Sequence, residues 1–159
     1  MLSAVSALAA QNIGAGKHER AALTLRYAVI IAVGFGFAVS VLMQFFAGPV
    51  VGLFTGESAV ILSGSQYLRS YIWDCMFAGV HFSFSGYFCA YGLSGISFLH
   101  NSMSILFVRI PGAYFASKYF AATLFPMGLA APAGSLFSII ICIFAFVWMK
   151  NRQKKRIYT

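Results

Sequence analysis

A carboxylate and an imidazole lie on one face of a long apolar stretch, where each could bind or transfer a cation. Residues three or four apart share one face of a helix, and one such polar stripe consists of Tyr67, Tyr71, Asp74, Ala78, His81 and Ser85. An aspartate at the middle of a membrane span costs about 2.5 to 3.5 kcal/mol, so Asp74 needs a reason to be there. The functional interpretation is a site for a cation or a proton. The structural alternative is that Asp74 lies near a membrane surface or pairs with Arg69.

His81 lies two turns from Asp74 on the same face. An unperturbed histidine has a pKa of about 6.5, which suits a proton relay; a hydrogen-bonded structural histidine is the alternative. Tyr71, Phe77 and Ser85 surround these two residues, and we expect them to line a substrate-binding surface. Aromatic rings on an inner face could bind flat, cationic organic molecules by stacking and by cation–π attraction.

Arg109 lies near the middle of another apolar stretch, directly ahead of Pro111. Arginine keeps its charge in proteins, so this side chain must be paired or hydrated. Its partner could be the carbonyl that Pro111 leaves free one turn earlier, or a carboxylate on a neighbouring helix. Arg109 could therefore serve either as a structural clamp between helices or as a contact to substrate. We interpret His100, near the end of the same stretch, as interfacial.

Membrane-spanning helices are the elements that position these residues. The composition is 60% hydrophobic and only 9% charged, which leaves too little polar surface for a soluble domain. A span needs about 20 apolar residues, and the sequence offers four such stretches at 27–46, 71–93, 98–119 and 129–149. They lack the alternation of a barrel strand, and helices satisfy their own backbone in lipid. The expected fold is an all-α, polytopic membrane bundle.

The first residues, 1–13, are apolar but too short to cross a bilayer, because they reach only about 20 Å. We interpret them as the end of a partial transmembrane helix and therefore suspect that the chain is truncated. Residues 14–26 are expected to form a cytoplasmic loop before the first complete span.

The net charge of +8 is concentrated on two flanks of the bundle. Lys17, Arg20 and Arg26 precede the first span, and the tail 150–159 that follows the last span is also basic. Four crossings place both flanks on one side, which the positive-inside rule identifies as the cytoplasm. We therefore predict a multi-pass protein of the cell membrane with a cytoplasmic C-terminus and the lipid bilayer as its surroundings. Nucleic acid is not an expected partner, because no basic domain with stacking aromatics is present.

No motif of a soluble enzyme is found. Cys75, Cys89 and Cys142 fall inside predicted spans without a Cys-x-x-Cys pair, which indicates buried hydrophobes. Phosphate-binding glycine loops, paired zinc ligands and a Gly-x-Ser-x-Gly elbow are all missing from the sequence. We expect no metal, no cofactor and no enzymatic activity.

Four stretches, in order along the chain, resemble the second half of the multidrug and toxic compound extrusion (MATE) transporters. The first runs from Ala9 to Lys17 and includes Gln11, Asn12, Gly14 and Gly16; the others are Pro49 to Thr55, Tyr67 to Arg69, and Val108 to Pro111 with Arg109. Family members have twelve spans in two bundles of six, so the chain is similar to the end of span eight through span twelve. One departure is the turn Gly92 to Gly95, which lacks the basic residue common there.

The resemblance implies antiport, in which inward flow of sodium ions or protons drives export of small, often cationic, drug-like compounds. It also implies a partner, namely the missing N-terminal bundle of the parent transporter, without which this chain alone should not transport. Asp74 lies on the span that carries a coupling carboxylate in some branches of the family. The alternative is an independent four-span membrane protein that associates with itself or with another membrane protein.

Overall fold

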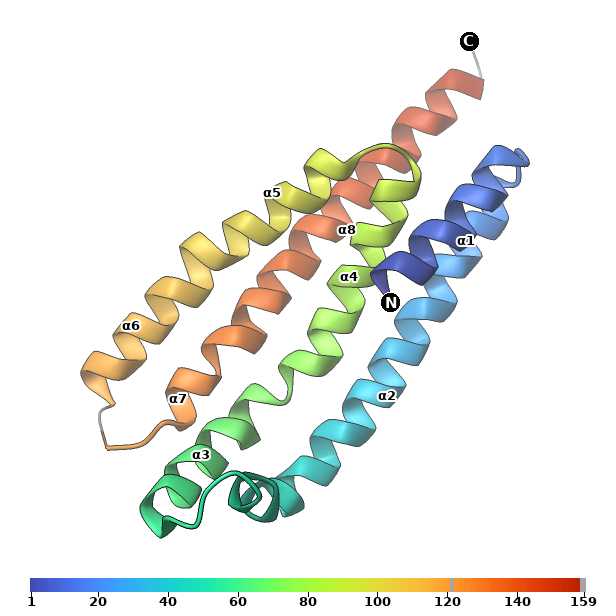
Figure 1. Ribbon diagram of the computed structural model, residues 1–159. Coiled ribbons are helices and arrows are strands. Elements are labelled where there is room, and N and C mark those ends of the chain that lie inside the picture. Colours follow the sequence, from blue (N-terminus) through green and yellow to red (C-terminus); the bar gives the residue numbers. More distant parts are fainter. Residues whose placement is uncertain (121, 158–159) are drawn as a thin grey trace.

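The computed structural model describes residues 1–120 and 122–157, with side chains placed through residue 151 except at 121. Its helices follow one another in the order α1 (Leu2–Gly14), α2 (His18–Gly52), α3 (Ser58–Tyr71), α4 (Asp74–Ala90), α5 (Ser94–Ser104), the π-helix η1 (Ile105–Arg109), α6 (Ile110–Tyr119), α7 (Phe125–Gly128) and α8 (Ala130–Ile157). No strand occurs in these ranges, which confirms the predicted all-α bundle (Figure 1).

Helix α4 lies at the centre of the bundle. Helices α1, α2, α5 and α8 all pack against it, and it supplies the buried rings of Tyr87 and Phe88. A Cβ atom at Gly86 would collide with the carbonyl oxygen of Leu2, so the absence of a side chain lets α1 cross α4 closely. The polar stripe on α4 is therefore surrounded by other helices.

The outer faces of the long helices are apolar. Phe35 and Phe45 on α2 are 72% and 74% exposed, and Phe144 on α8 is 73% exposed. Large exposed apolar surfaces mark contact with lipid or with other proteins. In the described part of the chain, two helical stretches are long and apolar enough to cross a membrane: α2 (His18–Gly52), and Phe125–Asn151, which comprises α7 and most of α8. The other two predicted spans are divided into shorter helices.

The predicted loop at 14–26 is wrong, because α2 begins at His18. Residues 18–26 contain good helix formers and no glycine or proline, so the polar start of the helix continues the apolar span. The chain reverses within Ala15–Lys17, where Gly16 adopts a left-handed φ of 71° that favours glycine.

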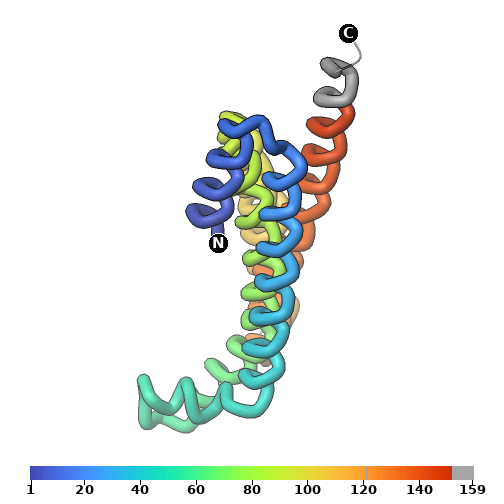
Figure 2. Tube along the Cα trace, turned by 90° about the vertical axis from the view of Figure 1, so that its right-hand side faces the viewer, coloured from blue at the N-terminus to red at the C-terminus, as the bar shows by residue number. Residues whose placement is uncertain are grey.

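The other predicted boundaries also differ from the structure. The stretch 71–93 is interrupted after Tyr71, the stretch 98–119 begins earlier at Ser94, and α8 continues through the basic tail to Ile157. Polar residues at the ends of these segments extend the helices beyond the apolar core. Viewed from the side, the end of α2 and the start of α3 project away from the long helices (Figure 2).

The turn between α1 and α2 and the C-terminal end of α8 lie at the same end of the bundle (Figure 1). His18 on α2 and Lys150 on α8 also line one pocket at this end. The two basic flanks are thus on one side of the bundle, and the cytoplasmic location of that side remains a prediction from charge.

Candidate functional site

A break between two helices places Asp74 inside the bundle. Helix α3 ends at Tyr71 and α4 begins at Asp74, so backbone groups at the break need partners outside their own helix. Helix α2 supplies them: Ser40 Oγ donates to the Ile72 carbonyl at 3.1 Å, and Gln44 Nε2 donates to the Arg69 carbonyl at 3.0 Å. The N-terminus of α4 also carries a partial positive charge that favours a carboxylate there.

Asp74 is 6% exposed and is held by two side chains from other helices. Arg109 Nη2 lies 3.4 Å from both carboxylate oxygens, and Ser135 Oγ donates a hydrogen bond to Oδ1. Arg109 Nη2 also donates to Ser135 Oγ at 2.7 Å. One carboxylate, one guanidinium and one hydroxyl therefore connect α4, η1 and α8.

The local structure of η1 and the start of α6 brings Arg109 to this position. Pro111 has no backbone N–H, so it cannot complete the regular ladder one turn earlier. The π-helix Ile105–Arg109 lies directly before this proline; such wide turns are frequent at functional positions. On the facing helix, a Cβ atom at Gly134 would lie 2.5 Å from Arg109 Cγ, so only glycine leaves room for the arginine.

His81 lies beside this group and is 1% exposed. Among the described residues, neither of its ring nitrogens has a hydrogen-bond partner, and the same is true of Arg109 Nε. His81 lines a pocket of about 460 Å³ together with Tyr71, Asp74 and Arg109. A buried polar group without a partner is costly, so its presence indicates a site where a water, an ion or a ligand can bind.

His100 forms a second polar centre next to His81, with ring centroids 5.7 Å apart. Its Nε2 lies 2.8 Å from Ser85 Oγ and its Nδ1 lies 3.2 Å from Ser138 Oγ. Ser138 Oγ donates its only proton to the His100 carbonyl at 3.1 Å. His100 Nδ1 therefore carries the proton donated to Ser138, and in the neutral ring Nε2 accepts from Ser85.

The structure brings together some of the sequence-predicted residues and separates others. Tyr71, Asp74 and His81 line one pocket, whereas Ser85 points to His100, and Phe77 lies outside the pocket lining. Arg69 is exposed and does not pair with Asp74. The interfacial interpretation of His100 is wrong, because this residue is fully buried between hydrogen-bond partners on α4 and α8.

The motif Gln11 to Gly16 forms the end of α1 and the reversal that follows it. The backbone N–H of Ala15 donates to the Gln11 carbonyl, the N–H of Lys17 donates to the Asn12 carbonyl at 2.8 Å, and Gly16 supplies the left-handed residue. Asn12 Nδ2 also donates to the Leu8 carbonyl at 2.8 Å. At Gly14, an added Cβ would have no described neighbour within 4 Å outside its own helical turn. These residues shape a turn.

The sequence interpretation did not identify Ser135, Ser104 or Ser138. Each lies in a helix that contains at least one other serine, so the sequence gives no signal of which serine has a buried partner. Ser104 Oγ donates to the Gly134 carbonyl at 2.6 Å, directly beside Arg109. Within the described residues, no group of three or more His, Cys, Asp or Glu side chains could hold a metal ion.

The MatE family model matches residues 1–115, which is most of the chain. The protein therefore belongs to the MATE family, a family of membrane transporters. A search among curated proteins found no match.

The fold is similar to a solved structure described as the inward-facing conformation of a multidrug resistance MATE family transporter of the MOP superfamily. The TM-score is 0.79 and the sequence identity is 19%. The match covers 99% of this chain and 36% of that transporter, so the chain spans about a third of its length.

Proposed function

We propose that this chain is part of a multidrug exporter driven by sodium ions or protons, with Asp74 as the coupling site. The observation that carries the proposal is the buried carboxylate at a helix break, next to a pocket that contains a buried histidine with no hydrogen-bond partner among the described residues. Intramembrane carboxylates are expensive and are retained mainly where they bind ions or protons.

The pairing of Asp74 with Arg109 determines how a coupling ion would act. In the described arrangement the two charges cancel, so a sodium ion or a proton that reaches Asp74 must compete with Arg109. A proton on Asp74 would remove the attraction to the guanidinium. Arg109 is 30% exposed on its side chain and therefore has room to move into the pocket. Ion binding would in this way change the contact between α4 and η1.

The pocket supports exchange between an ion and an organic compound. It combines the aromatic rings of Tyr71 and Phe82 with the polar groups of Asp74, His81 and Arg109. Its volume of about 460 Å³ is within the range of small-molecule sites, about 300 to 1,000 Å³. A compound in this pocket and an ion on Asp74 would compete for the same space, which is what antiport requires. His81 would carry the proton toward or away from Asp74.

Drug export from cells tests this proposal. Asp74→Asn removes the charge and keeps the size of the side chain, so we expect loss of ion-dependent export of a fluorescent organic cation by the full transporter. Glu57→Gln is the matched control, because Glu57 is an exposed carboxylate outside the pocket. Normal export by Asp74→Asn at wild-type expression would exclude Asp74 as the coupling site.

A further inference from the structure

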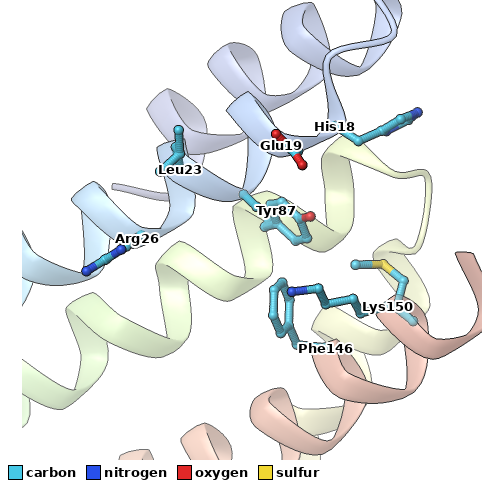
Figure 3. Close-up of a pocket in the computed structure, with 9 residues that line it drawn as sticks. His18, Glu19, Leu23, Arg26, Tyr87, Phe146 and Lys150 are labelled. Atoms are coloured by element: carbon cyan, nitrogen blue, oxygen red, sulfur yellow. The ribbon is translucent and has the colours of Figure 1, made fainter. Parts of the chain in front are cut away.

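A second pocket lies at the basic end of the bundle (Figure 3), and it shares no lining residue with the pocket that contains Asp74. Its volume is about 450 Å³. Three helices line it: α2 between His18 and Arg26, α4 through Tyr87, and α8 through Phe146, Met149 and Lys150. Helices α2 and α8 both pack on α4, and the pocket occupies the space between them over Tyr87.

The floor of this pocket is aromatic and already ordered. Tyr87 and Met149 are 3% and 5% exposed, and the rings of Tyr87 and Phe146 are 5.5 Å apart. The Tyr87 hydroxyl donates to the Tyr91 hydroxyl at 3.5 Å, and that hydroxyl lies 3.1 Å from His18 Nδ1. These contacts connect α4 to the start of α2, so the pocket exists before any ligand binds.

The rim of the pocket carries one cation on each wall. Arg26 belongs to α2 and Lys150 belongs to α8, one turn after Phe146 and on the same helix face (Figure 3). Glu19 on α2 is the opposing charge. In the part of the chain that the structure describes, none of these three residues forms an ion pair. With His18 neutral, the rim therefore has a net charge of +1.

The pocket lies where the apolar surface ends and the basic surface begins. Below it, Ile30 on α2 and Phe144 on α8 expose 55% and 73% of their surface, as lipid-facing residues do. Beside it, Trp148 on α8 is about half exposed, and tryptophan is typical of the membrane interface. Beyond Lys150 the sequence continues with four more basic residues. A boundary of this kind between apolar and basic surface is typical of the depth of lipid headgroups.

We propose that this pocket binds the headgroup of an anionic phospholipid, with its phosphate between Arg26 and Lys150 and its acyl chains along α2 and α8. Basic pockets between transmembrane helices recognise such headgroups. A headgroup with one negative charge neutralises the rim, whereas a zwitterionic headgroup leaves the excess positive charge in place. Glu19 limits the strength of binding because it repels the phosphate. This site is independent of the function proposed for Asp74.

Lipid binding to the purified full-length protein tests the proposal. In detergent, we expect phosphatidylglycerol to bind more tightly than phosphatidylcholine, as measured by native mass spectrometry or by titration. Arg26→Gln and Lys150→Gln should each weaken phosphatidylglycerol binding about fivefold, the effect of one basic residue near an anionic headgroup. Glu19→Gln should tighten it. Arg20→Gln is the matched control, because Arg20 is exposed at the same end but outside the pocket, and it should change binding less than twofold.

Several results would overturn the proposal. One is equal affinity for phosphatidylglycerol and phosphatidylcholine, and another is an Arg20→Gln effect as large as that of Arg26→Gln. Preference for phosphatidylethanolamine, weakened by Glu19→Gln, would indicate an ammonium-binding site instead. Displacement of the lipid by an equal concentration of glycerol 3-phosphate would indicate a site for soluble phosphate. Arg26 and Lys150 are exposed, so thermal unfolding of these variants should match the wild type and exclude misfolding.

Discussion

Ser135 donates its single hydroxyl proton to Asp74, and it can therefore only accept a hydrogen bond from Arg109. The direct distances between Arg109 Nη2 and the Asp74 oxygens are 3.4 Å, longer than the usual charge-assisted hydrogen bond of about 2.7 to 2.9 Å. The 2.7 Å bond from Arg109 to Ser135 supplies a closer connection between the two charges. Ser135 thus holds together an ion pair that would otherwise be loose.

Removal of this hydroxyl should weaken the bundle. Ser135→Ala takes one hydrogen bond from a buried carboxylate, and we expect a loss of about 1 to 3 kcal/mol in the free energy of unfolding. Chemical unfolding in detergent measures the loss. Ser117→Ala is the control, because Ser117 is exposed and its hydroxyl donates only to the Tyr114 carbonyl. Equal stability of the two variants would contradict the assigned role of Ser135.

Asp74 and Arg109 should show energetic coupling in a double-mutant cycle. Asp74→Asn and Arg109→Gln each leave one charge without its partner, whereas the double variant leaves none. We expect a coupling energy of about 1 kcal/mol or more, below the values for fully buried pairs because Arg109 is partly exposed. Unfolding of the four proteins in the same detergent gives this number. Strict additivity would show that the two residues do not interact.

The two buried histidines should respond differently to substitution by phenylalanine. His81 has two unpaired ring nitrogens among the described residues, so His81→Phe should raise stability or leave it unchanged. His100→Phe removes contacts to Ser85 and Ser138 and should cost about 2 kcal/mol. Thermal unfolding of both variants in one detergent makes the comparison. A large loss of stability in His81→Phe would show that this ring has a structural partner.

The His81→Phe variant also distinguishes a role of His81 in stability from a role in transport. If His81 carries protons, this variant should fold well and export poorly, with its ion dependence reduced. Export measured at matched expression provides the second readout. Wild-type export by a stable His81→Phe protein would exclude a role in coupling.

Gly134 should tolerate no side chain. A Cβ atom there would lie 2.5 Å from Arg109 Cγ and 2.9 Å from Ser104 Oγ, so Gly134→Ala must displace the arginine. We expect a cost of about 1 to 3 kcal/mol from overpacking, with a loss of export. Gly34→Ala in α2 is the control, because no atom of the described residues outside its own helical turn lies within 4 Å of its added Cβ. Similar stability of both variants would contradict the close approach of α8 and η1.

The bundle could be predicted from sequence because apolar length is a strong signal. The run at 27–46 lies within α2, and the run at 129–149 lies within Phe125–Asn151; among the described residues these are the two stretches that can cross a membrane by length and composition. The ends of the helices were harder to predict, because the segments His18 to Arg26 and Lys150 to Ile157 are rich in polar residues yet continue a helix. The break after Tyr71 contains no proline or glycine; it depends on Ser40 and Gln44 of another helix, which local sequence cannot reveal.

Only part of the candidate site could be predicted from the sequence, for a similar reason. Asp74, His81 and Arg109 stand out because charged and ionisable residues are rare in apolar segments. Their partners do not stand out: Ser135 is one of two serines in α8, and only the fold brings it to Asp74. His100 was misread because its sequence position lies near a helix end, whereas α4 and α8 cover it from both sides.

Transport by the full-length protein in proteoliposomes tests the central claim most directly. An imposed inward gradient of sodium ions or protons, without any gradient of organic substrate, should drive net movement of a fluorescent organic cation in the opposite direction. We predict that Asp74→Asn abolishes this movement, and that Glu57→Gln retains it. Gradient-driven transport by Asp74→Asn at the wild-type rate would contradict the account.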